Sequence, residues 1–340
     1  MTENATTAPE APGTPAPGVP RRSLPQLVRR FLIDLPEWGV LVVVLTALVI
    51  VFWAGSPYFM RWDNLRNVLI AVSTVGILSC TTTMLLVAGQ FDLSVGAGSS
   101  LVATIFAWRF AHGNGEALSV LIAVGVGLGI GFVNGFLVTV IGINALITTI
   151  ATLAIMRNFA YIIGDGQAIQ INGFTTLGLD RPVLQIPWMV FIFAAVALLT
   201  WLAMRYSVFG RSLYAIGANP TAARLSGIRV ARVLFIGFIL SGAAIALSGL
   251  IVASQTGQGT GNAAIGLELS AITAVVLGGA SLAGGRGSII GTILGVLIIG
   301  VINNGLTLLN IISYWQEVIR GLLLVTAVGF DQLRLRLTDR

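Results

Sequence analysis

Residues 231–253 read ARVLFIGFILSGAAIALSGLIVA, and their only charged residue is Arg232, at the second position. A helix of about 20 apolar residues is long enough to cross the hydrocarbon core of a bilayer. This stretch therefore predicts a helix that spans a membrane and begins beside Arg232.

The composition extends that prediction to the whole chain. Of 340 residues, 56% are hydrophobic and only 9% are charged, and the mean hydropathy is +0.93. Ordinary soluble domains carry about 25% charged residues. We therefore expect an all-α polytopic membrane protein in which lipid surrounds most of the chain.

Apolar runs between Gly, Pro and charged residues predict about ten transmembrane helices. The runs are 37–56, 65–88, 93–110, 117–141, 144–164, 186–204, 231–253, 268–284, 288–310 and 314–330. The third and eighth are candidates for broken or re-entrant segments, because Asp92 and a Gly-rich stretch interrupt them. Repeated glycines at 127, 131 and 135, and at 291 and 295, predict close helix packing.

The ends of the chain are polar. Residues 1–36 contain seven of the eleven prolines, and such a segment buries too little apolar surface to fold, so it predicts a disordered tail. We expect a transmembrane domain over 37–331 and a short C-terminal tail over 332–340.

Arginine placement predicts the orientation, because short cytoplasmic loops are rich in basic residues. With ten crossings and the N-terminus inside, Arg61, Arg66, Arg109 and Arg181 face outward, and Arg157 and Arg320 lie within predicted helices. The other arginines are cytoplasmic: Arg21, Arg22, Arg29, Arg30, Arg205, Arg211, Arg224, Arg229, Arg232, Arg286, Arg334, Arg336 and Arg340. This bias predicts that both termini are cytoplasmic.

Several activities are excluded by residue type. All 19 basic residues are Arg, so the chain has no Lys for a Walker A loop and any ATPase must be another subunit. The arginines flank apolar segments instead of forming a solvated basic face, which argues against nucleic acid. One His and one Cys, His112 and Cys80, cannot form a His/Cys metal cluster. We expect no cofactor, no metal and no covalent chemistry.

Residues 205–232 form the longest predicted cytoplasmic loop, and its centre, 221–227, reads TAARLSG. Pro220 suits the first turn of a helix and Gly227 can end it, so a short surface helix is predicted. The segment resembles the coupling segment of ATP-binding-cassette (ABC) importer permeases, with the pattern Glu-Ala-Ala, three variable residues and Gly, although Thr221 replaces Glu. A solvated connector without a partner is the alternative. The coupling residues implied by the resemblance are Gly217, Asn219, Pro220, Ala222, Ala223, Arg224 and Gly227.

Further blocks narrow the resemblance to the ribose-type sugar permeases over about residues 65–330. Residues 89–96, GQFDLSVG, are similar to the family's Gly-Ile-Asp-Leu-Ser-Val-Gly block. Phe-Gly-Arg at 209–211, the Gly-rich stretches 275–279 and 281–287, and Asn-Gly-Leu at 304–306 also resemble it. The chain departs from the family at 268–273, where ELSAIT replaces Glu-Leu-Asp-Ala-Ile-Ala, and at Asn158, where Gly often follows the arginine.

The resemblance implies an importer permease for a small sugar, a pentose or hexose, in the bacterial inner membrane. It implies a homodimer, an external sugar-binding protein, and a cytoplasmic ATPase subunit that holds ATP and Mg²⁺. Membrane lipid is a further expected partner, and nucleic acid is not.

A sugar path needs neutral hydrogen-bonding groups, and ionisable groups within lipid usually face protein or a wet cavity. Asp92 either lines the path or caps a broken helix. Arg157 and Asn158 are candidates for a polar face or for packing contacts, and Glu317 and Arg320, three residues apart, for a structural pair. The candidate path residues are Gln90, Asp92, Ser94, Asn144, Thr148, Thr152, Asn303 and Asn304, and Asn134 supplies a further amide.

Two alternatives remain open from the sequence. The same architecture suits branched-chain amino acids, nucleosides or another small polar solute. A proton- or sodium-driven carrier working alone would use Asp92 or Glu268 as its coupling carboxylate.

Overall fold

The structure is a computed structural model that describes residues 38–338, with side chains described for 38–329. The chain divides into two units, Met1–Pro36 and Glu37–Arg340, and all the described residues belong to the second. The predicted disordered tail over 1–36 therefore lies outside the described residues.

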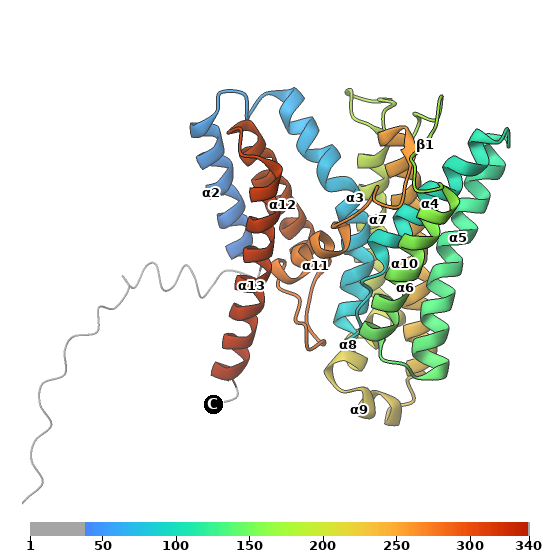
Figure 1. Cartoon of the computed structure of the whole chain (residues 1–340). Coiled ribbons are helices and arrows are strands. Elements are labelled where there is room, and N and C mark those ends of the chain that lie inside the picture. Colours follow the sequence, from blue (N-terminus) through green and yellow to red (C-terminus); the bar gives the residue numbers. More distant parts are fainter. Residues whose placement is uncertain (1–37, 339–340) are drawn as a thin grey trace, which may run out of the picture. The chain divides into compact units, whose positions relative to one another are not determined.

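Almost all regular structure in the described residues is helical (Figure 1). The helices are α2 (Gly39–Gly55), α3 (Trp62–Val87), α4 (Val95–Ala111), α5 (Glu116–Phe136), the π-helix η1 (Leu137–Ile141), α6 (Ala145–Ile163), α7 (Trp188–Tyr206), α8 (Val208–Ala218), α9 (Pro220–Leu225), α10 (Val230–Thr256), α11 (Leu267–Leu277), α12 (Ile289–Leu308) and α13 (Ser313–Thr338). Two short antiparallel strands, β1 (Ile169–Gln170) and β2 (Gln258–Gly259), join the long loop after α6 to the end of α10.

A helix lies at each of the ten predicted apolar runs, and the prediction of an all-α polytopic membrane protein is confirmed. Among the described residues, six helical segments are long and apolar enough to cross a membrane: α3, α5 with η1, α6, α7, α10 and α12. The apolar helices α2, α4 and α11 are shorter. Ten crossings therefore stay a prediction.

The third and eighth runs are the ones that glycine and polar residues interrupt. Helix α4 starts only at Val95, after an irregular turn over 88–94. Helix α11 ends at Leu277 and not at the predicted 284, because Gly279, Gly284 and Gly285 all adopt left-handed φ angles that end a helix. Its 11 residues span about 17 Å, too short for a hydrocarbon core of about 30 Å.

The other boundaries that differ are at the C-terminal end and in the longest loop. Helix α13 continues to Thr338, past the boundary drawn at 331, because no Gly or Pro follows Gly329. The loop over 205–232 contains two helices, α8 and α9, and only the second was expected.

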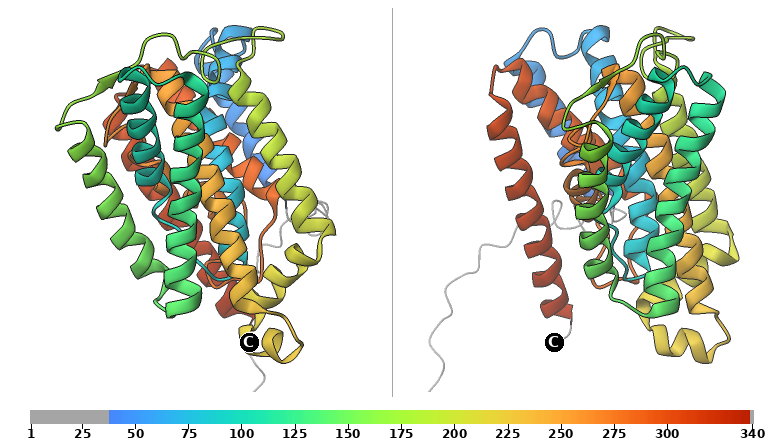
Figure 2. Two further views of the ribbon diagram at one scale, coloured as in Figure 1. Left: turned by 90° about the vertical axis from the view of Figure 1, so that its right-hand side faces the viewer. Right: turned by 45° about the vertical axis from the view of Figure 1, so that its right-hand side comes forward.

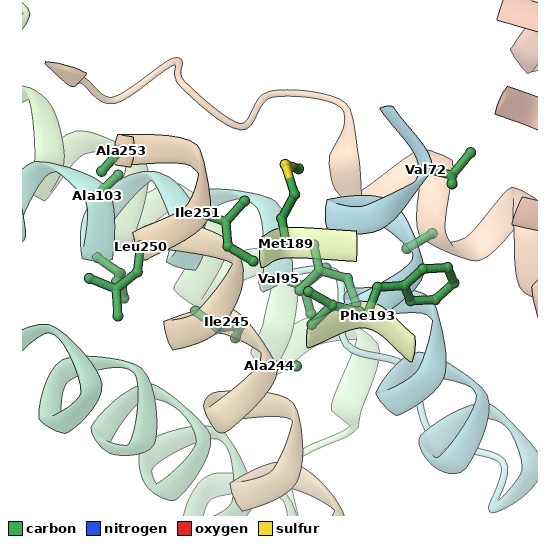
Figure 3. Packing of buried hydrophobic residues seen from close by; sticks show 14 of the residues in the cluster. Val72, Val95, Ala103, Met189, Phe193, Ala244, Ile245, Leu250, Ile251 and Ala253 are labelled. Carbon is green, nitrogen blue, oxygen red and sulfur yellow. The ribbon is translucent and has the colours of Figure 1, made fainter. Parts of the chain in front are cut away.

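Helix α3 lies at the centre of the packing, with α7, α10, α11 and α12 against it (Figures 1 and 2). Met189 and Phe193 of α7 point into the buried apolar cluster that also holds Val72 of α3 (Figure 3). A Cβ at Gly76 would overlap the ring of Phe193. The absence of a side chain at 76 is therefore what lets α7 lie against α3.

Gly127, Gly131 and Gly135 of α5 face α10, which confirms the close helix packing predicted from their spacing. A Cβ at Gly131 would overlap the carbonyl oxygen of Phe238, and one at Gly127 would lie 2.7 Å from the carbonyl oxygen of Gly242. Gly291 and Gly295 of α12 likewise lie against backbone of α11, at Gly278 and Ala274. Small residues let these backbones meet where lipid gives no hydrophobic drive for helix association.

Replacing Gly131 with Val is expected to force α5 away from α10. Overpacking of this kind costs about 1–3 kcal/mol, so the purified protein should unfold at a clearly lower temperature in detergent. Gly129→Val is the matched control, because a Cβ at Gly129 has no neighbour within 4 Å. Equal losses of thermal stability in the two variants would contradict the close contact between α5 and α10.

Candidate functional site

Helices α8 and α9 project at one end of the bundle, beyond the long helices (Figure 1). Ser207 caps α8 by accepting a hydrogen bond from the Gly210 backbone N–H at 3.0 Å. Asn219 caps α9 by accepting from the backbone N–H groups of Thr221 and Ala222, each at 3.0 Å. Pro220 occupies the first turn of α9, and Gly227 follows its end with a φ of +84°. The short surface helix predicted from Pro220 and Gly227 is therefore confirmed.

The predicted coupling residues fall into an exposed set and a buried set. Asn219, Pro220, Ala222, Arg224 and Gly227 are exposed, whereas Ala223 is buried against the apolar cluster that contains Met84 and Leu213. Leu225, which is not among the predicted coupling residues, has a side chain that is 85% exposed at the end of α9.

Gly217, the last of the coupling residues, lies in a junction made almost entirely of backbone. A Cβ at 217 would overlap the carbonyl oxygen of Val87, at the end of α3. The same carbonyl oxygen accepts a hydrogen bond from the Gly285 backbone N–H at 2.8 Å. The Tyr214 hydroxyl donates to the Gly287 carbonyl oxygen at 2.8 Å. Helix α8 is thus attached both to α3 and to the Gly-rich stretch over 278–287.

Asp92 is buried just before α4 and accepts three hydrogen bonds. They come from the Ser94 backbone N–H at 3.0 Å, from the Ser94 hydroxyl at 2.5 Å and from the Ser241 hydroxyl of α10 at 2.6 Å. The Asn134 side-chain amide of α5 donates to the Ser94 hydroxyl at 2.9 Å. This network joins the start of α4 to α5 and α10.

The candidate path residues do not gather in one place. Asn144 is exposed and caps α6, accepting from the Leu146 backbone N–H at 2.9 Å. Thr148 is buried, and its hydroxyl has no hydrogen-bond partner. Thr152 lies with Asn134 on an apolar groove between α5 and α6. Gln90 is half-buried in the turn after α3.

Asn304 of α12 pairs with Asn64 of α3. Each side-chain amide donates to the other's oxygen, at 2.8 and 2.9 Å. This reciprocal pair ties the first turn of α3 to the second half of α12.

Asn303 lines a cavity of about 240 Å³, which we call the polar cavity. Helices α3, α11, α12 and α13 and the residues just before α11 enclose it. Its polar side chains are Ser270, Asn303, Glu317 and Arg320, and the rest of its lining is apolar. Glu317 and Arg320 form the expected ion pair at 2.9 Å. The cavity therefore combines neutral and charged hydrogen-bonding groups in a space large enough for a small polar solute.

A second ion pair joins α6 to α11. An Arg157 guanidinium nitrogen lies 3.4 Å from the Glu268 carboxylate, and the exposed fractions of the two side chains are 28% and 10%. A Cβ at Gly96 of α4 would overlap the other oxygen of this carboxylate. Both residues stand out in the sequence as charges within or near apolar runs, but their pairing was not predicted, because 111 positions separate them.

The described residues contain no group of three or more His, Cys, Asp or Glu side chains that could hold a metal ion. Cys80 is buried and unpaired within α3.

Comparison with known proteins gives consistent matches over most of the chain. The profile of the family described as "Branched-chain amino acid transport system / permease component" matches residues 64–328. The chain is 39% identical to the L-arabinose transport system permease protein of Escherichia coli over 300 residues, covering 88% of this chain and 91% of that one. It is also 39% identical to the ribose import permease protein of Bacillus subtilis over 293 residues, covering 84% and 89% of the two chains. A probable ABC transporter permease protein of Escherichia coli is 37% identical over 319 residues, which cover 94% and 95%. No solved structure matches.

Proposed function

Because the chain belongs to the family of branched-chain amino acid transport system permease components, we propose that it is the permease subunit of an ABC importer for a small sugar. The observation that carries the choice of a sugar is the 39% identity to permeases named for L-arabinose and ribose over most of each chain. The family is one of permease components and not of enzymes, so ATP hydrolysis belongs to a separate subunit.

The polar cavity supports a path for a neutral solute. A sugar offers hydroxyl groups, and Ser270 and Asn303 present neutral groups that can both donate and accept hydrogen bonds. Gln90, Asp92, Ser94, Thr148 and Thr152 lie elsewhere in the bundle, and in our proposal they support the helices around the path. The cavity is small and only partly polar, which suits passage better than tight binding, so specificity belongs to an external sugar-binding protein.

Helices α8 and α9 form the proposed docking element for a cytoplasmic ATPase subunit that holds ATP and Mg²⁺. The exposed residues of α9 and Leu225 would contact the ATPase. Gly217 would carry its movement to the end of α3, because α8 touches the Val87 carbonyl there with no side chain between them.

The assembly that this proposal requires is a homodimer in the bacterial inner membrane, with ten crossings in each protomer and both termini cytoplasmic. The excess of arginine at the predicted cytoplasmic loops supports this orientation. The short helices α2, α4 and α11 would then cross or enter the membrane together with the longer helices around them.

The proposal is tested by uptake of radiolabelled ribose and L-arabinose into proteoliposomes. They would contain this chain, its ATPase and its binding protein, with and without ATP. Uptake of either sugar that needs ATP and both partners supports the proposal. Uptake of leucine or a nucleoside in place of sugar would assign another solute to the same machinery, and uptake driven by an ion gradient without ATP would identify a solitary carrier.

Replacing Leu225 with Asp is expected to abolish ATP-driven uptake while the protein keeps its melting temperature. A side chain that is 85% exposed contributes little to the fold, but a charge on an apolar contact would weaken docking by about 2 kcal/mol or more, as loss of a central contact residue does. Binding of the purified ATPase to the permease, measured by pull-down, should fall in parallel. Leu225→Met keeps an apolar side chain of similar size and should behave as the wild type.

A further inference from the structure

A second and larger cavity lies at the end of the bundle that carries α8. Its volume is about 610 Å³, and we call it the basic cavity. The described residues that line it include Trp38, Trp201, Arg205, Tyr206, Arg211 and Tyr214. None of the polar cavity's residues contributes to it, so the two are separate sites.

The basic cavity lies where three apolar helices have an end. Trp38 immediately precedes α2, Arg205 and Tyr206 are the last two residues of α7, and Ser288 caps the start of α12. Helices α7 and α12 are both candidate membrane spans. Because spanning helices end near the headgroup region of a bilayer, the cavity lies at one membrane surface.

The charge in the basic cavity is positive. Arg205 and Arg211 are exposed, and neither takes part in any of the three ion pairs found among the described side chains. None of the described residues that line the cavity is acidic. Ile289 and Ile290 are the first two residues of α12, and the first backbone N–H groups of a helix lack partners within it and favour an anion.

Aromatic side chains complete the lining. The rings of Trp201 and Tyr206 meet edge to face with centroids 5.7 Å apart, and Trp38 is 44% exposed. Trp and Tyr are enriched at the level of lipid headgroups, where one end of the ring is apolar and the other is wet. Burial raises the pKa of the Tyr214 hydroxyl, and the nearby charge of Arg205 opposes this shift.

We propose that the basic cavity binds the headgroup of an anionic membrane phospholipid. Its phosphate would lie between Arg205 and Arg211 near the start of α12, and its acyl chains would follow the apolar surfaces of α2 and α7. Free phosphate shares the same chemistry, but the apolar and aromatic lining at the ends of membrane helices favours the lipid.

The binding test uses fluorescence quenching, because Trp38 and Trp201 line the cavity. The full chain, purified in a neutral detergent, would be titrated with phosphatidylglycerol whose acyl chains carry bromine, which quenches nearby tryptophan. Brominated phosphatidylcholine provides the neutral-headgroup comparison. We expect saturable quenching by phosphatidylglycerol, which Trp38→Phe combined with Trp201→Phe should largely remove.

Variants of the two cavity arginines distinguish binding in the basic cavity from nonspecific attraction of the protein to anionic lipid. A basic residue near an anionic membrane surface contributes about 1 kcal/mol, so Arg205→Gln and Arg211→Gln should each weaken binding about fivefold and together about thirtyfold. Arg232→Gln is the matched control, because Arg232 is exposed in the first turn of α10 but does not line the cavity. Melting temperatures of the variants would show that each is folded.

Three outcomes would overturn the proposal. They are equal quenching by both lipids, unchanged affinity in the double arginine variant, and displacement of the lipid by millimolar inorganic phosphate, which would indicate a site for a soluble anion. The readout is lipid binding by the permease alone, so failure of this proposal is distinguishable from failure of sugar import.

Discussion

Replacing Glu268 with Gln is expected to lower the stability of the protein strongly. Arg157 forms an ion pair with Glu268, and the change leaves the partly buried guanidinium without an opposite charge. Removing one member of a buried pair typically costs about 3–5 kcal/mol. We expect the lower end, about 3 kcal/mol, because the Arg157 side chain is 28% exposed and keeps some access to water.

Glu116 supplies the matched control for this experiment. It is exposed in the first turn of α5 and takes part in none of the three ion pairs found among the described side chains, so removal of its charge should cost about 1 kcal/mol or less. Thermal unfolding of Glu268→Gln and Glu116→Gln in the same detergent should therefore differ strongly. The double variant Arg157→Met with Glu268→Leu removes both charges and should regain most of the loss. If Glu268→Gln were as stable as Glu116→Gln, the Arg157 pair would have no structural role.

Replacing Gly217 with Val is expected to impair transport through the junction between α8 and α3. Any Cβ at this position would overlap the Val87 carbonyl oxygen and crowd the Gly285 backbone N–H. Overpacking costs about 1–3 kcal/mol, and each 1.4 kcal/mol lost from the coupled arrangement reduces its population about tenfold. ATP-driven sugar uptake should therefore fall by about tenfold or more.

The informative measurement for Gly217→Val is the number of ATP molecules hydrolysed for each sugar imported. The exposed surface of α9 is untouched, so the ATPase should still bind while uptake fails, and the ratio should rise. Gly125→Val is the control, since it also places Val in a helix but has no neighbour within 4 Å. If a folded Gly217→Val protein hydrolysed the same number of ATP molecules for each sugar imported, the junction between α8 and α3 would not take part in coupling.

The parts of the fold that the sequence predicted are those that local chemistry determines. Long uncharged runs such as 231–253 identify helices directly, and Pro220 with Gly227 defines α9 because both act within one turn of it. Helix α8 was missed because only one residue, Ser207, separates it from α7, with no Gly or Pro between them. The predicted run over α11 extended to 284, beyond the end of the helix at Leu277, because apolar residues continue past Gly278. Only the left-handed backbone of the following glycines ends the helix.

The parts that the sequence did not predict depend on contacts between distant segments. The repeat at Gly127 and Gly131 indicated a close helix partner, but nothing in it identified α10. Arg157 and Glu268 were both conspicuous as charges within apolar runs, yet their pairing requires α6 and α11 to be placed first. Of the residues that line the polar cavity, only Asn303 was a candidate path residue, since Glu317 and Arg320 were interpreted as a structural pair.

In the proposed coupling, the amide pair of Asn64 and Asn304 would hold one end of α3 while the other end moves. Asn64 is tied to α12 near one end of the helix, and Val87 touches α8 at the other, 23 residues later, a length of about 35 Å. With the first end held as a fulcrum, a displacement of about 3 Å at Val87 tilts the helix by about 5°. Val72 and Val75 lie between the two ends and line the polar cavity, so a small stroke at the membrane surface would change the width of the cavity by a fraction of that distance.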